Sequence, residues 1–82
     1  MSAFLVARTI PGLDAEQMRA MQRALLVASR GSGVRYTGSA WLPAEQRCLC
    51  LYDAAGRDDV RRVNDMAQVP FAWMAEAIEM PA

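Results

Sequence analysis

Cys48 and Cys50 are the residues of this chain whose chemistry best suits a soft metal ion. They lie two positions apart in an apolar segment, so in an extended strand both side chains point to the same face. Neighbours at this spacing are roughly 6.5–7 Å apart along the strand. A disulfide needs Cβ atoms about 4 Å apart, so we expect free thiols. Two such pairs across a dimer axis would supply four thiolates, whereas the alternative is simple core packing.

Arg8 is the only charged residue in the apolar segment AFLVART, residues 3–9. A guanidinium on the face of a sheet needs an ionic partner or an anion to bind. Asp53 and Glu76 are the carboxylates that we expect to pair with Arg8. The alternative is that Arg8 binds a carboxylate or phenolate of a small ligand.

Four aromatic side chains could line a ligand pocket with Arg8, namely Tyr36, Trp41, Tyr52 and Trp73. Cavities in domains of this shape lie between the sheet and the helices or between paired sheets. Buried aromatic rings can equally serve as packing. These five residues are our predicted ligand-binding site, and Cys48 and Cys50 are our predicted metal ligands.

The composition excludes several classes of chemistry. The chain has no histidine and all nine basic residues are arginine, so Ser-His, Cys-His and lysine Schiff-base catalysis are excluded. Nine acidic residues bring the net charge to zero, which argues against binding to nucleic acid or to an anionic membrane surface. No apolar run approaches the roughly 20 residues of a membrane span, and no signal peptide is visible, so we expect a cytoplasmic protein.

The elements that position these residues follow from the apolar periodicity. We expect strands over residues 3–9 and 72–80, helices over 14–30 and 56–69, and a hairpin over 33–54 that turns near 43–46. The order βαββαβ is that of a ferredoxin-like domain, in which a four-stranded antiparallel sheet carries both helices on one face. We therefore predict a single α+β domain over residues 1–82.

Both helices have a predicted apolar stripe and a defined start. Asp14 and Gln17 have capping-box spacing at the start of the first helix. Asp58 and Asp59 open the second, where negative charge is favourable. The apolar stripes are Met18, Met21, Leu25 and Ala28 in the first helix, and Val60, Val63 and Met66 or Ala67 in the second.

The hairpin strands carry apolar residues on both faces. Val34, Tyr36, Ala40 and Leu42 alternate with Trp41, and Leu49 and Leu51 alternate with Cys48, Cys50 and Tyr52. Strands of this kind lie in a sheet that is covered on both sides. The helices cover one side. We expect the Tyr, Trp and Cys side chains on the other side, covered by a second copy in a homodimer of the dimeric α/β barrel type.

Four segments together resemble a known family: FLVARTIPG at 4–12, GVRYTGS at 33–39, RCLCLYDA at 47–54 and VRRVNDMAQVPFAWMAEAIEM at 60–80. Their order and spacing are similar to those of a family of small bacterial proteins whose characterised member is a nickel-binding ferredoxin-like dimer. The domain is otherwise of unknown function. The resemblance implies a homodimer and a role for nickel or another divalent metal.

The resemblance is incomplete at the positions that would hold a metal. The matching positions are Arg8, Pro11, Gly12, Ser39, Cys50 and Tyr52. Family members commonly have Glu at the position of Ala7, His at those of Gly38 and Val63, and Arg at that of Trp73. Without imidazole, the remaining ligands are Cys48, Cys50 and carboxylates. Nickel binding of the family kind is therefore in doubt, and we expect no cofactor.

Three functions are compatible with these features. We favour a small homodimeric protein that binds a small organic ligand or, in degenerate form, a divalent metal. The first alternative is a cofactor-independent cyclase, isomerase or monooxygenase of the dimeric α/β-barrel type. Its acid–base groups would be Tyr36, Tyr52, Asp53 or Glu76, with Arg8 as electrostatic stabiliser. The second alternative is a structural or protein-interaction module without a cavity.

Overall fold

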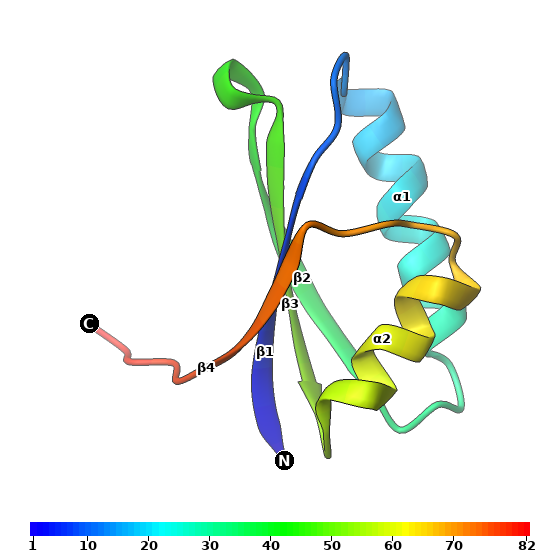
Figure 1. The fold of residues 1–82 in the computed structure, drawn as a ribbon, viewed down its shortest axis with the longest axis vertical. Coiled ribbons are helices and arrows are strands. Elements are labelled where there is room, and N and C mark those ends of the chain that lie inside the picture. The colour runs from blue at the N-terminus through cyan, green and yellow to red at the C-terminus, as the bar shows by residue number, and fades with distance from the viewer.

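The computed structural model describes residues 1–82 and contains four strands and two α-helices. In chain order the elements are β1 (Ser2–Thr9), α1 (Ala15–Ser29), β2 (Arg35–Leu42), the 3₁₀ turn η1 (Pro43–Glu45), β3 (Arg47–Ala54), α2 (Arg57–Met66) and β4 (Trp73–Ala77). The strands are antiparallel, in the order β2-β3-β1-β4. Both helices lie on the same side of the sheet (Figure 1). The predicted α+β ferredoxin-like architecture is confirmed.

Helix α1 begins at the predicted cap. The Asp14 carboxylate accepts from the Gln17 backbone N–H at 2.7 Å, and the Gln17 side-chain oxygen accepts from the Asp14 backbone N–H at 3.0 Å. Two N–H groups at the helix start are thereby satisfied. The predicted apolar stripe of α1, from Met18 to Ala28, is buried against the sheet.

Helix α2 follows Gly56 and carries Asp58 and Asp59 in its first turn, as predicted. Val60 and Val63 are buried. Met66 points into solvent and is 66% exposed, so Ala67, which packs against the core, continues the apolar stripe. Neither helix has the length and hydropathy that a helix needs to cross a membrane.

The strand β4 pairs with β1 and ends at Ala77, earlier than the predicted strand over 72–80. Ala77 is opposite Ala3, and β1 begins at Ser2. The chain beyond Ala77 therefore has no strand left to pair with, which explains why β4 stops there.

The hairpin turns where it was predicted, because η1 joins β2 to β3 and Gln46 takes a left-handed conformation. A β-bulge between Tyr36 and Gly38 interrupts the pairing of β2 with β3. A bulge adds a residue to one strand and reverses its in–out alternation. Tyr36 is therefore opposite Tyr52 and Trp41 is opposite Cys48, on one face. The prediction that Tyr36 shares a face with Ala40 and Leu42 is wrong for this reason.

The two faces of the sheet differ from the prediction in a second way. The Cys and Tyr side chains of β3 lie under the helices, because Tyr52 contacts Asn64 of α2 and its neighbours on that face are fully buried. The open face, opposite the helices, carries Leu5, Leu49 and Leu51, all half-buried. The prediction that the Tyr, Trp and Cys side chains need a partner sheet to cover them is therefore wrong for five residues on the helix side, Tyr36, Trp41, Cys48, Cys50 and Tyr52.

Candidate functional site

Arg8 is the centre of the polar cluster beneath the helices. It projects from β1 and is only 2% exposed. Its Nη2 donates to Asn64 Oδ1 of α2 at 2.7 Å, and its Nη1 contacts Met21 Sδ of α1 at 3.7 Å. Its Nε has no acceptor. A fully buried guanidinium with one neutral oxygen partner is a strained electrostatic arrangement, because buried charges are ordinarily paired.

Neither predicted carboxylate pairs with Arg8. The ion pairs in the structure are Arg47 with Glu45 and Arg62 with Asp59. Asp53 is opposite Ala3, on the other face of the sheet and five residues along β1 from Arg8. Glu76 is opposite Phe4, four residues away. At about 3.4 Å per residue, both carboxylates are too far from the guanidinium to pair with it.

Asn64 is a site residue that the sequence analysis missed. It is fully buried, accepts hydrogen bonds from Arg8 and from the Tyr52 hydroxyl at 3.2 Å, and donates to the Val60 carbonyl at 2.8 Å. Its oxygen therefore accepts two hydrogen bonds and its amide nitrogen donates one. A signal existed in the sequence, because Asn64 lies four residues after Val60 on the apolar side of the helix, where a polar residue needs a buried partner.

Cys48 and Cys50 are both free and fully buried. They flank Leu49, which lies on the open face, so both thiols are on the side that the helices cover. Ser39 Oγ of β2 donates to Cys50 Sγ at 3.1 Å, and the Tyr36 hydroxyl is hydrogen-bonded to the same Ser39 oxygen. Arg8 and Trp41 are the cross-strand neighbours of Cys48. We call Arg8, Cys48, Cys50, Tyr52 and Asn64 the thiol–arginine cluster.

The two thiols of the cluster differ in acidity. The neighbouring Cys48 thiol, which can donate to a Cys50 thiolate, lowers the pKa of Cys50 from its ordinary 9.0 to about 6. Ser39 and the positive charge of Arg8 act in the same direction, against burial. The pKa of Cys48 is raised by its hydrogen bond with Cys50 and by burial. The opposite shifts mean that Cys50, rather than Cys48, is the thiol of the pair that loses its proton first, close to the positive charge of Arg8.

The tyrosines of this face are poor acid–base groups. Burial raises the pKa of Tyr52 and also that of Tyr36. Their rings pack against each other with centroids 5.4 Å apart. Both phenols therefore remain protonated at neutral pH and contribute packing and hydrogen bonds rather than a base.

The predicted aromatic pocket does not form as a single set. Tyr36, Trp41 and Tyr52 share the helix side with Arg8, but Trp73 is opposite Ala7, on the open face, and is 44% exposed. None of the five principal hollows of the surface is lined by Arg8, Trp41 or Tyr52. The space between sheet and helices, one of the two places where a cavity was expected, is occupied by buried side chains of the core.

One hollow lies on the open face of the sheet. It has a volume of about 300 Å³ and is lined by Leu5, Leu49, Leu51 and residues 37–40 of β2. Gly38 has no side chain, and a Cβ at this position would have no other atom within 4 Å, so the space above it is empty. The apolar depression thus lies next to the β-bulge, on the open face of the sheet.

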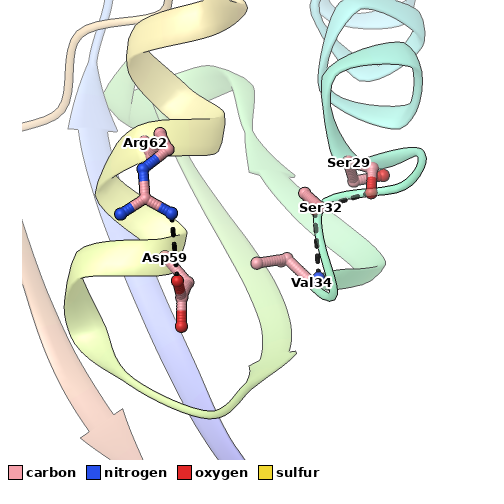
Figure 2. Close-up of polar contacts among 5 residues, drawn as sticks. All are labelled: Ser29, Ser32, Val34, Asp59 and Arg62. Atoms are coloured by element: carbon pink, nitrogen blue, oxygen red, sulfur yellow. Dashed lines mark hydrogen bonds and ion pairs between the residues drawn. The ribbon is translucent and has the colours of Figure 1, made fainter.

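A second hollow, of about 340 Å³, lies between the C-terminal end of α1 and α2. Figure 2 shows the polar contacts of three residues that line it, Ser32, Asp59 and Arg62. Arg62 donates to Asp59 at 3.2 Å, and the Ser32 hydroxyl donates to the Ser29 carbonyl at 2.6 Å and accepts from the Val34 N–H at 3.0 Å. These groups hold the loop and the helix in place and leave no buried polar atom that points to a ligand.

Comparison with known proteins decides the family. A family model described as "Nickel responsive protein SCO4226-like" matches residues 4–76. The chain belongs to this SCO4226-like family. Its fold is also similar to the crystal structure of SCO4226 from Streptomyces coelicolor A3(2), with a TM-score of 0.89 over 98% of this chain and 100% of that one, at 18% identity. No curated protein matches the chain.

The SCO4226-like family is described as nickel responsive, so the fit of the cluster to nickel matters. The structure gathers no group of three or more His, Cys, Asp or Glu side chains. Cys48 and Cys50 are accompanied by a guanidinium rather than by further anionic ligands. They also point toward the helices, so a second copy packed on the open face would not bring four thiolates together. This side-chain set lacks the nitrogen and oxygen ligands of a typical tetragonal Ni(II) site and provides only two of the four ligands that such a site needs.

Proposed function

We propose that this protein is a homodimeric binding protein in which two open sheet faces pack together and enclose a small apolar organic ligand. The observation that carries the proposal is the apolar depression over Gly38 in an uncovered, leucine-rich sheet face. Exposed apolar patches rimmed by polar groups are typical of interaction sites. Membership of a family described as nickel responsive is compatible with a small binding protein.

The size of the open face suits a second copy of the chain. Three strands of eight residues and one of five, about 4.8 Å apart, span roughly 500 Å² of flat area. A stable interface buries about 800 Å² of accessible surface on each partner, and the relief of side chains increases the accessible area beyond the flat estimate. Ile78 and Met80, which follow β4, are each 86% exposed and extend the apolar surface.

The charges of the open face are placed as in a specific interface. Its centre, formed by Leu5, Leu49 and Leu51, has no charged side chain. Arg35 is opposite Asp53 at one end of the strands, and Arg47 lies at the other end of β3. Interfaces combine a dry apolar centre with a polar rim. A two-fold arrangement of the same face on itself satisfies this pattern without a second kind of partner.

The ligand that suits the hollow is small and largely apolar. The hydroxyl of Thr37, which lines it, already donates to the Leu51 carbonyl at 3.0 Å. The hollow offers leucine and alanine side chains as its main contacts, and it carries no charged side chain. Sheet-to-sheet packing would place the two depressions of a dimer in one enclosed apolar chamber.

Sedimentation of a matched pair of variants tests the dimer. Leu51→Asp places a charge in the centre of the open face, whereas Val27→Asp places the same charge on an α1 position that is 60% exposed. We expect the wild type and Val27→Asp to sediment as dimers and Leu51→Asp as a folded monomer. A monomeric wild type at micromolar concentration would overturn the proposal.

Binding of 1-anilinonaphthalene-8-sulfonate to the native dimer tests the chamber. Ala40→Leu fills the hollow, and Ala24→Leu adds the same atoms to a groove on the helix side. We expect Ala40→Leu to weaken dye binding about tenfold, because apolar contact with the dye is lost. A tenfold change corresponds to about 1.4 kcal/mol of binding free energy. Ala24→Leu should leave dye binding unchanged. Equal binding by both variants, with dimer mass retained, would contradict the ligand part of the proposal. Ni(II) is the comparison probe, because of the family description.

A further inference from the structure

We propose that Cys48 and Cys50 form a binding site for one monovalent thiophilic metal ion, of the Cu(I) or Ag(I) type, beside Arg8. The site lies under the helices, on the face opposite the proposed dimer interface, and is independent of the proposed ligand chamber. The two thiols point to the same side of β3, both are free, and both are fully buried.

The first argument is the buried charge. Arg8 is a permanent cation with no carboxylate partner. Two thiolates and one monovalent ion together carry a charge of −1, which the guanidinium balances. Two thiolates and one divalent ion carry no charge, which leaves Arg8 uncompensated in the core, and isolated buried charges are costly. Charge alone therefore selects a monovalent ion over Ni(II) or Zn(II).

The second argument is the softness of the nearby atoms. Thiolate and thioether sulfur select Cu(I), whereas imidazole and carboxylate ligands suit harder divalent ions. Met21 Sδ lies 3.7 Å from Arg8 Nη1, so a thioether is at the same buried guanidinium. The cluster therefore offers two thiols and a nearby thioether, and it contains no imidazole or carboxylate.

The third argument is a surplus of N–H and O–H donors around the thiols. Arg8 Nε and Trp41 Nε1 are buried without an acceptor, and their residues flank Cys48 on the two neighbouring strands. Ser39 Oγ already donates to Cys50 Sγ. Donors in the outer shell of a metal site orient its ligands and stabilise their negative charge. Two unpaired donors beside a cysteine thus suit a state in which both sulfurs are deprotonated.

Binding involves no electron transfer. Each thiol proton that the ion displaces passes to the buffer, and two metal–sulfur bonds form. Because both sulfurs are fully buried, the ion enters only when α1 or the edge strand β2 opens briefly. Uptake by the folded chain is therefore expected to be slower than uptake by the urea-unfolded chain.

Native mass spectrometry of the reduced wild-type protein with silver nitrate and nickel acetate in competition tests the proposal without any variant. We expect one Ag(I) per chain, an endpoint at one equivalent for two thiols, and no bound Ni(II). Far-ultraviolet circular dichroism should be unchanged. An endpoint at two equivalents, loss of structure on binding, or a preference for Ni(II) would each overturn it.

Variants then locate the site. Cys48→Ser and Cys50→Ser should each abolish binding of the shared ion. Met21→Leu should weaken it by roughly 10-fold, in the range found for supporting groups of metal sites. Met80→Leu, at an exposed methionine, should have no effect. Retention of one-equivalent binding by either Cys→Ser variant would contradict the site.

Arg8→Gln tests the charge argument directly. The amide can still donate to Asn64, but the positive charge is gone. We expect the variant to bind Ag(I) more weakly than wild type and to gain Zn(II) binding, because two thiolates and Zn(II) are now neutral together. An unchanged metal preference in a folded Arg8→Gln protein would show that charge does not set selectivity. If the variant does not fold, the wild-type competition remains decisive.

Discussion

The two faces of one sheet are built from the same strands but differ in the groups that they bury. The helix-covered face buries a guanidinium, an amide, two thiols and a phenol in the thiol–arginine cluster. The open face leaves three leucines half-buried around a hollow. Alternate residues of β1 and β3 supply both faces. The covered face is thus specified by hydrogen bonds inside one chain, whereas for the open face we propose a second copy of the chain as its cover.

The largest expected effect comes from Asn64, the partner of the buried charge. Asn64→Leu removes the acceptor of Arg8 and Tyr52. Leaving a buried charged donor unsatisfied should lower the free energy of unfolding by about 3 kcal/mol. Urea denaturation measures the change, and Asp65→Asn, at the exposed neighbouring position, should alter it by no more than about 0.5 kcal/mol. Similar stabilities for the two variants would show that the cluster is not what holds the covered face.

A pH series addresses the thiols of the same face. The folded pKa of Cys50 is depressed to about 6, below its ordinary 9.0, so the unfolded chain binds more protons between these values. Stability should therefore rise from pH 6 to pH 9, by an amount of the order of 2 kcal/mol. The pKa of Cys48 is raised, so above pH 9 its contribution should reverse the trend. The urea midpoint of Cys50→Ala should lack the rise, and a rise of equal size in that variant would remove Cys50 as its cause.

Tyr52→Phe is a milder change within the cluster. It deletes the hydroxyl that donates to Asn64 and keeps the ring that packs on Tyr36. We expect a loss of about 1 kcal/mol, the net value of one hydrogen bond, in the same urea experiment. A loss as large as that of Asn64→Leu would mean that the ring, rather than the bond, had been disturbed.

The smallest effect should be on the open face. Leu49→Thr changes a half-buried side chain of the open face. At protein concentrations below the association midpoint, the free energy of unfolding should change by about 0.5 kcal/mol. At higher concentrations the variant should have a lower free energy of unfolding than the wild type, because only the wild type gains stability from self-association. Concentration-independent stability in the wild type would remove the contrast between the faces.

Much of the fold could be predicted because local signals agreed with the final structure. Asp14 and Gln17 marked the start of α1, residues 43–46 marked the hairpin turn, and Pro70 marked the limit of α2. The stripe of α1 was correct because its buried residues recur with helical spacing. These features depend on residues close together in the sequence, where capping and periodicity act.

The site was harder to predict because it depends on which way β3 faces. Its alternating residues form two apolar sets, one with Cys48, Cys50 and Tyr52 and one with Leu49 and Leu51. Alternation shows that two sets exist but does not say which one the helices cover. In the structure, Arg8 shows which set the helices cover. Its guanidinium contacts Met21 of α1 and Asn64 of α2, and Arg8 is opposite Cys48. The bulge at Gly38 was not visible either, since it appears only when two strands are aligned. The predicted homodimer stays a prediction.

Because both cysteines are completely buried, the rate at which they are alkylated measures how often this fold opens. An alkylating reagent cannot reach either sulfur until the helix layer lifts away from β3 or the chain unfolds. Because the chain has no other cysteine, every added mass records such an event. If Cys50 is labelled before Cys48, the β2 side opens locally through Ser39, and if both gain mass together, the sheet and helices separate as one cooperative unit.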